Sequence, residues 1–225
     1  MPRPKQRTRA LRDQVLHVAV EMLAREGLAG FTTRKVARGA GTSTPAVYEL
    51  FGDKAGLVRS VFFEGFRLLR RQLDPLPETR DPRADLIALF GIYRRFLRDN
   101  PVLAHVMFSR PFADFDPGPA ELEAGRAVRE LIVHRVRRCI DAGQIARTTD
   151  ATDAAHVLVS LVQGLASAEI ASRLGRSRES VDRRWALALD AALDGLAAPS
   201  PRSARRPGRA TARPRSKVAR RAGTR

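Results

Sequence analysis

The stretch TTRKVARGAGTSTPAVYELF, residues 32–51, has the pattern of two short helices joined by a tight turn. The first helix is predicted over about residues 33–40, and the second begins after Ser43, whose hydroxyl is a favoured N-cap. Gly41 breaks the chain between them, because glycine readily adopts the left-handed conformation that such a turn requires. Pro45 fits the first turn of the second helix, where its missing N–H costs no hydrogen bond.

The two predicted helices have an inward side and an outward side. Small and apolar residues form the inward side, which is expected to pack on the preceding helix: Val36, Ala37, Ala40, Val47 and Phe51. Small or polar residues form the outward side of the second helix, which can approach base edges in a DNA major groove: Thr44, Pro45, Ala46, Tyr48 and Glu49. A buried hairpin in a generic bundle fits these polar side chains poorly. The segment therefore predicts a helix-turn-helix element.

Helical periodicity continues on both sides of this element, and no segment of four or more residues alternates as a strand would. A helix over about residues 10–26 precedes it and stops at Gly27. The cap-and-proline pairs Asp81-Pro82 and Asn100-Pro101 begin two of the later helices. Those helices are predicted at about residues 53–73, 82–98, 101–108, 119–143, 152–174 and 179–196, with a loop at 109–118. The predicted fold is all-α.

Charge divides the chain into unlike parts. Residues 1–75 hold 14 Lys and Arg against 7 Asp and Glu, residues 76–198 hold 17 of each sign, and residues 199–225 hold 10 basic residues and no acidic one. A polyanionic partner is therefore expected for the two ends, and a different partner for the middle. The predicted segments are a basic N-terminal arm (1–8), a three-helix helix-turn-helix DNA-binding domain (9–55), a helical effector-binding and dimerisation domain (56–198) and a disordered basic tail (199–225).

The two basic ends have separate expected roles. Arg3, Lys5, Arg7 and Arg9 alternate along the arm, which can follow a DNA backbone, enter a minor groove or serve only as an unstructured start. The tail has no aromatic residue to stack on bases, so we expect it to raise DNA affinity about equally for all sequences through counterion release.

The region from residue 9 to residue 60 resembles the DNA-binding domain of the TetR family of repressors. The residues that carry the resemblance are Gly27, Phe31-Thr32-Thr33, Val36-Ala37, Ala40-Gly41, Ser43, Val47-Tyr48, Phe51-Gly52, Lys54 and Leu57. The resemblance implies phosphate contacts by Thr33, Ser43, Tyr48 and Lys54, and base contacts by Arg34, Thr44, Pro45 and Ala46. Hydroxyls and a lysine near helix N-termini suit phosphate oxygens, and a guanidinium suits the O6 and N7 atoms of guanine. The sequence departs from the family pattern at Thr42, Pro45 and Leu50.

The later helices resemble the TetR C-terminal domain that is named for a Trp-His-Gly motif. The resemblance rests on the runs 93–96, 100–101 and 105–108 and on residues 159–166. In the last run Val159 and Gln163 replace the Trp and the His, and only Gly164 is retained.

An effector pocket is predicted within residues 82–196, where the aromatic and polar candidates have an alternative as plain core. The candidates in this region are Tyr93, His105, Met107, Phe108, Phe112, His134 and Gln163. Two aromatic residues of the preceding helix, Phe62 and Phe66, are added to them. Because this region lacks a clustered charge, the predicted effector is small and mostly apolar.

The last two helices are expected to pair with their copies in a four-helix homodimer interface, or alternatively to form only intramolecular core. The proposed contacts are Val157, Leu161, Ala168, Ala171, Trp185, Leu189, Ala192 and Leu196. A two-fold dimer would present two recognition helices to a palindromic operator, which multiplies the discrimination between sequences.

The predicted function is that of a cytoplasmic, sequence-specific transcriptional repressor that a small effector releases from double-stranded DNA. The alternative is an activator or a non-specific nucleoid-type DNA-binding protein with the same helix-turn-helix element and basic tail. An enzyme is disfavoured, since four scattered histidines, the single Cys139 and the lack of a Gly-rich phosphate loop offer no metal set, triad or nucleotide site. No cofactor, metal or membrane partner is expected, and no apolar run approaches the length of a membrane span.

Overall fold

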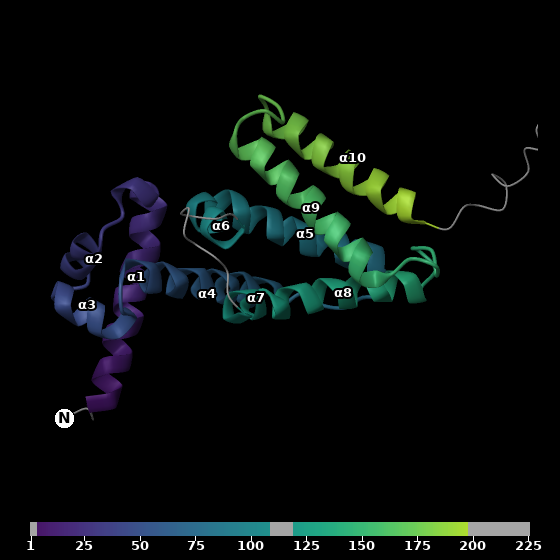
Figure 1. Ribbon diagram of the computed structural model, residues 1–225. Coiled ribbons are helices and arrows are strands. Elements are labelled where there is room, and N and C mark those ends of the chain that lie inside the picture. The colour runs from purple at the N-terminus through teal and green to yellow at the C-terminus, as the bar shows by residue number, and fades with distance from the viewer. Residues whose placement is uncertain (1–3, 109–118, 198–225) are drawn as a thin grey trace, which may run out of the picture.

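The computed structural model describes residues 4–108 and 119–197, and within these ranges the chain forms helices joined by turns (Figure 1). The helices are α1 (Pro4–Gly30), α2 (Thr33–Gly39), α3 (Thr44–Phe51), α4 (Lys54–Leu73), α5 (Pro82–Asp99), α6 (Pro101–Phe108), α7 (Pro119–Ala124), α8 (Arg126–Asp141), α9 (Ala151–Ile170) and α10 (Arg178–Leu196). The predicted all-α class is confirmed. The predicted loop at 109–118 and the tail at 199–225 lie outside the described residues.

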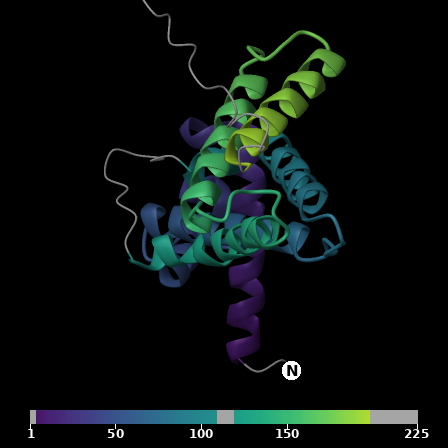
Figure 2. The ribbon, with the colours of Figure 1, turned by 90° about the vertical axis from the view of Figure 1, so that its right-hand side faces the viewer.

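The helices form two groups that α4 connects. Helices α1, α2 and α3 gather at one end of the molecule, and α4 runs from that end alongside α7 and α8 and below α6, α9 and α10 (Figure 1). Helices α9 and α10 lie side by side at the other end, and both views show the first part of α1 extending past its neighbours (Figures 1 and 2). One continuous apolar core runs from Val15 on α1 to Leu193 on α10, so the two groups share their packing.

Several helix boundaries differ from the prediction, and the helix predicted over 152–174 ends earlier, at Ile170. Helix α1 begins at Pro4 instead of near residue 10, because proline suits a first helical turn and the residues after it favour helix. The predicted stop at Gly27 is confirmed as a break within α1, where that residue has a φ of +66°. The single helix predicted over 119–143 is two helices, α7 and α8, separated at Gly125. Glycine is a poor helix former, so the division at this residue has a local cause.

Short polar side chains fix where several helices begin. The Ser43 hydroxyl accepts a hydrogen bond of 3.3 Å from the Ala46 amide, and Asp53 Oδ1 accepts one of 2.7 Å from the Gly56 amide. The capping role predicted for Ser43 is therefore confirmed at α3, and Asp53 caps α4 in the same way. These caps fix where the recognition helix α3 and the long linking helix α4 begin.

A buried ionic cluster fastens the connection between α4 and α5 to α8. Arg138 donates a hydrogen bond of 2.7 Å to Asp85 Oδ2, and Thr79 donates to the same carboxylate through its amide and its hydroxyl at 2.8 and 2.7 Å. Arg135, also buried, donates to two main-chain carbonyls of the connection. Burial alone raises the pKa of Asp85, but the bonds from Arg138 and Thr79 outweigh it and lower that pKa to about 2.

A second polar cluster joins α5, α9 and α10. Arg94 on α5 donates two hydrogen bonds of 2.7 and 2.8 Å to the Glu169 carboxylate on α9. Trp185 on α10 donates its indole N–H to the same carboxylate at 2.7 Å, and the Arg94 guanidinium lies 4.8 Å from the centre of the indole ring. Asp182 forms a further ion pair with Arg94 at 2.7 Å. Together these contacts hold α10 against the rest of the chain.

Candidate DNA-binding surface and effector cavities

One concave surface joins the start of α2, one side of α3 and the start of α4. The residues that line it are Thr32, Thr33, Arg34, Thr44, Tyr48 and Lys54. All but Thr32 are predicted DNA-binding residues, so segments from three helices bring five of the eight predicted contacts together. The other three, Ser43, Pro45 and Ala46, occupy the cap and first turn of α3 beside this surface. Sequence reasoning missed Thr32, although its position before α2 marks it as an N-cap.

The exposed groups on this surface suit a phosphate backbone and base edges. Tyr48 is 46 % exposed even though most aromatic side chains of the described residues are buried. Arg34 and Lys54 are exposed cations, and the Lys54 ammonium lies 5.9 Å from the centre of the buried Phe31 ring. Thr33 is only 6 % exposed, so only a small part of this residue can contact a phosphate. The surface therefore carries hydroxyls and positive charge without a carboxylate among its lining residues.

Backbone geometry at two glycines fixes the angle of α3. Gly41 has a φ of +62° in the turn between α2 and α3, a conformation that side-chain-bearing residues rarely adopt. At Gly56 a Cβ atom would lie 1.9 Å from the carbonyl oxygen of Phe51, so only glycine permits this close approach of α4 to the end of α3. The predicted glycine turn is confirmed, while the requirement at Gly56 appears only in three dimensions.

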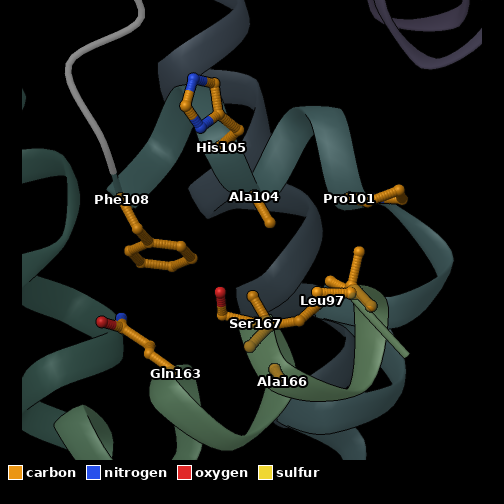
Figure 3. Close-up of a pocket in the computed structure, with 10 residues that line it drawn as sticks. Leu97, Pro101, Ala104, His105, Phe108, Gln163, Ala166 and Ser167 are labelled. Carbon is orange, nitrogen blue, oxygen red and sulfur yellow. The ribbon is translucent and has the colours of Figure 1, made fainter. Parts of the chain in front are cut away.

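A first cavity of about 400 Å³ lies between α6 and the C-terminal half of α9. Figure 3 shows Phe108 of α6 on one side and Gln163 and Ser167 of α9 on the other. The remaining lining residues are mostly apolar: Leu97, Pro101, Ala104, His105, Ala166, Ile170 and Ala171. Its wall therefore suits an apolar molecule with few polar groups.

A second cavity of about 200 Å³ lies between α8 and the N-terminal half of α9. Its lining residues are Phe66, Tyr93, Phe108, Gly125, Val128, Arg129, Ile132, Ala155, His156, Val159 and Gln163. Phe108 and Gln163 therefore belong to the walls of both cavities. Gln163 donates a hydrogen bond of 3.0 Å to the Tyr93 hydroxyl, and burial raises the pKa of that tyrosine, so it stays a neutral phenol.

Only some of the predicted effector residues line these two cavities. Phe66, Tyr93, His105, Phe108 and Gln163 line one or both cavities. Phe62 and Met107 are buried in the core and line neither, as the core alternative anticipated. His134 also lies apart from both, with its Nε2 atom 3.0 Å from Glu78. Phe112 lies outside the described residues. Sequence reasoning missed Arg129 and His156, since helical periodicity marks neither as a cavity residue.

Helix α6 has two faces with different neighbours. Ala104, His105 and Phe108 line the cavities, while Leu103 and Met107 press on α4 at Gly65. A Cβ atom at Gly65 would lie 2.5 Å from Met107 Sδ and 3.1 Å from Leu103 Cδ1. Helix α6 also packs on α1. Helix α6 thus lines the cavities and also contacts α4 and α1.

The predicted dimer residues differ in their exposure to solvent. Val157 is 57 % exposed, Ala171 is exposed, and the partly exposed ones are Leu161, Ala168, Ala192 and Leu196. Trp185 and Leu189 are only 3 % and 6 % exposed, so they face the interior of their own chain and offer almost no surface to a second copy. Leu187, 68 % exposed, points outward from α10 instead, because two residues along a helix correspond to a turn of about 200°.

The described ranges contain neither a metal-binding cluster nor a membrane-spanning helix. No group of three or more His, Cys, Asp or Glu side chains there is placed to hold a metal ion. None of the helices in the same ranges has both the length and the apolar character that a membrane crossing requires.

A helix-turn-helix surface on one helical group, linked by a long helix to a second helical group, is typical of DNA-binding transcriptional regulators. Residues 15–61 match a family model described as "Bacterial regulatory proteins, tetR family", and residues 86–192 match one described as "Tetracyclin repressor-like, C-terminal domain". The chain belongs to the TetR family and is a transcriptional regulator, not an enzyme. The Trp-His-Gly type stays a prediction.

Solved structures share this fold. A protein with unknown function from Rhodococcus sp. RHA1 is 30 % identical, with a TM-score of 0.73, and the match covers 84 % of this chain and 96 % of that one. A putative TetR-family transcriptional regulator from Rhodococcus sp. is 20 % identical, with coverage of 84 % and 98 % and a TM-score of 0.63. The fatty acid degradation regulator FadR from Bacillus halodurans is 17 % identical, with coverage of 87 % and 98 % and a TM-score of 0.66. No curated protein sequence matches the chain.

Proposed function

We propose that this TetR-family regulator is a repressor that binds a palindromic operator as a homodimer and is released by a small, mostly apolar effector. It acts in the cytoplasm, where its operator DNA lies. The effector occupies the cavities between α6, α8 and α9. The observation that carries this proposal is the double contact of α6, which lines the cavities with one face and presses on α4 and α1 with others.

Release follows from a shift between two arrangements of α6 and α4. The interlocked packing of Met107 against Gly65 leaves no space for α6 to move without α4, because closely packed interiors transmit displacement. Helix α4 carries Lys54 at its start, as part of the concave surface that we propose faces DNA. An effector that binds better to the arrangement with displaced α6 would therefore draw the dimer away from the operator.

The homodimer is supported by exposed apolar side chains on the last two helices. Val157, Ile170 and Leu187 are 57 %, 45 % and 68 % exposed in the single chain. Pairing of α9 and α10 with their copies would bury them and form a four-helix interface. One recognition helix makes few base contacts, so two of them at a fixed spacing are needed for a specific operator.

The experiment is a footprint of the full chain on DNA from its own gene neighbourhood, followed by titration of the protected site. We expect a discrete palindrome, bound by two chains. Addition of an effector that binds the cavities should weaken operator binding, and operator DNA should weaken effector binding by the same factor. Diffuse protection would favour the nucleoid-type alternative, and stronger transcription on promoter binding would favour an activator. Coexistence of effector and operator without mutual loss of affinity would contradict the release mechanism.

A further inference from the structure

The second cavity has an apolar interior and a cationic rim. Its interior is formed by the rings of Phe66, Tyr93 and Phe108 and by aliphatic side chains of α8 and α9. Arg129 of α8 and His156 of α9 line the same cavity, and both side chains are exposed to solvent. No Asp or Glu belongs to the wall of this cavity among the described residues. A ligand that fills it would therefore have an apolar body beside a positive charge.

Arg129 differs from the arginine one turn before it on α8. The Arg126 guanidinium binds Glu130 at 2.7 Å and Glu123 at 3.1 Å, so its charge is matched within the helix surface. The Arg129 guanidinium has no ion pair or hydrogen bond with any residue in the described part of the chain, whereas its main-chain amide donates to the Gly125 carbonyl. Glu130, which lines an outer groove together with Arg129, is the carboxylate that Arg126 holds. The five donors of the Arg129 guanidinium are thus available to a ligand.

His156 adds a second polar group at the rim. Its Nδ1 atom lies 2.9 Å from the Thr152 carbonyl oxygen, one helical turn earlier, which fixes that nitrogen as the donor. The imidazole is therefore held in one orientation on α9. Its Nε2 atom has no partner among the described residues and remains open to a ligand or to water.

We propose that the second cavity binds an apolar molecule that carries one carboxylate, with the carboxylate on Arg129 and the apolar body against Phe66, Phe108 and Tyr93. This inference rests on the proposed function and adds a chemical class to its effector. A planar guanidinium matches a carboxylate in a two-bond arrangement, which a neutral group of the same shape cannot reproduce. The shared residues Phe108 and Gln163 place the far end of such a ligand beside the first cavity.

The test compares two probes of the same shape, 1-naphthaleneacetate and 1-naphthaleneacetamide, by calorimetric titration of the full chain. They differ only in the carboxylate that the amide replaces. We expect the acid to bind about three- to tenfold more tightly, since a charge-assisted pair is strong but Arg129 is exposed to solvent. The variant Arg129→Gln should bring the acid to the affinity of the amide and leave the amide unchanged, and Arg129→Lys should retain part of the preference.

Arg137→Gln is the matched control, because Arg137 lies on the same helix and lines the outer groove but neither cavity. It should leave both affinities unchanged. Equal binding of acid and amide, an unchanged preference in Arg129→Gln, or no binding of either probe at millimolar concentration would overturn the carboxylate site. Each of these results leaves the operator footprint, measured without ligand, to decide the proposed function. Tight binding of the acid without loss of operator affinity would instead support the site and contradict effector release.

Discussion

Arg12 on α1 donates a hydrogen bond of 2.8 Å to the main-chain carbonyl of Leu50, in the last turn of α3. The same guanidinium lies 4.6 Å from the centre of the Phe51 ring and reaches the Ser60 hydroxyl on α4 at 3.4 Å. One side chain thus joins three helices at the C-terminal end of the recognition helix. These contacts lead us to predict that Arg12 is a positioning residue for α3.

The change Arg12→Met should weaken operator binding by about three- to tenfold without changing its salt dependence. Methionine keeps the length of the side chain but loses the hydrogen bond to Leu50, which is worth about 1–1.5 kcal/mol. A lost phosphate contact would reduce the slope of log affinity against log salt by about 0.9, whereas a misplaced helix reduces affinity with the slope unchanged. Fluorescence anisotropy with labelled operator over a series of salt concentrations measures both quantities.

Arg25→Met is the control for this experiment, because Arg25 is an exposed arginine near the other end of the same helix. We expect affinity and salt slope to match those of the native chain. A reduced salt slope in Arg12→Met would assign that residue a phosphate contact and contradict its positioning role.

Substitutions on the concave DNA-binding surface should separate into two kinds. Tyr48→Phe and Lys54→Ala should weaken binding to all sequences about equally, because a hydroxyl and an ammonium there are expected to meet phosphates. Arg34→Ala and Thr44→Ala should change which bases are preferred, with a cost of about 1–3 kcal/mol on the best site. Selection of bound sequences from a random pool distinguishes the two kinds. A changed base preference in Lys54→Ala, or an unchanged one in Arg34→Ala, would reverse these assignments.

The sequence predicts well what depends on neighbours in the chain. The caps at Ser43 and Asp53 and the break at Gly27 follow from bonds and backbone angles that span three or four residues. The grouping of Thr33, Arg34 and Tyr48 on one surface follows from the same local pattern, because a helix-turn-helix has nearly fixed internal geometry. The turn and helix starts of this element could therefore be predicted, whereas the start of α1 and the close approach at Gly56 could not.

Packing between distant helices could not be predicted in the same way. Trp185 has the spacing of an interface residue, but Glu169 on another helix accepts its indole N–H and draws it into the chain. His134 has the composition of a pocket residue, but its partner is Glu78, which is far away in the sequence. Arg129 resembles its neighbour Arg126 in type, but Arg126 pairs with two glutamates of its own surface whereas Arg129 lines the second cavity. Each of these outcomes depends on contacts that span many residues and that periodicity does not encode.

The buried Asp85 should make the stability of the chain depend on pH in the acidic range. Its pKa is lowered in the folded state to about 2, so its contribution to the free energy of unfolding is complete above about pH 4 and is lost as the pH falls through about 2. Asp85→Asn should reduce the free energy of unfolding at neutral pH by about 1–3 kcal/mol, because Arg138 and Arg135 lose their charged partner. Urea unfolding between pH 2 and pH 7 measures the free energy of unfolding of the native chain and of Asp85→Asn.

The difference between the two proteins should shrink as the pH falls from 4 to 2. Asp74→Asn is the control, since Asp74 pairs with Arg70 at the surface and such pairs contribute at most about 1 kcal/mol. A difference that stays constant down to pH 2 would show that Asp85 acts through its shape and not through its charge.

Gly65→Ala should destabilise the contact between α4 and α6, whereas Gly91→Ala should not. At Gly65 the new methyl group would lie 2.5 Å from Met107 Sδ and 2.8 Å from its Cγ, so α6 or the buried Met107 side chain must move. Overpacking of this kind costs about 1–3 kcal/mol, which outweighs the gain of up to about 1 kcal/mol from replacing a helical glycine. Gly91 also lies within a helix, but a Cβ atom there meets nothing within 4 Å, so its replacement should stabilise the chain slightly.

Because α6 also lines the first cavity, Gly65→Ala should weaken operator binding in the absence of effector, while Gly91→Ala keeps it. Thermal unfolding and operator titration of both variants measure these effects, and a Gly65→Ala protein with native stability and native operator affinity would contradict the coupling of α6 to α4.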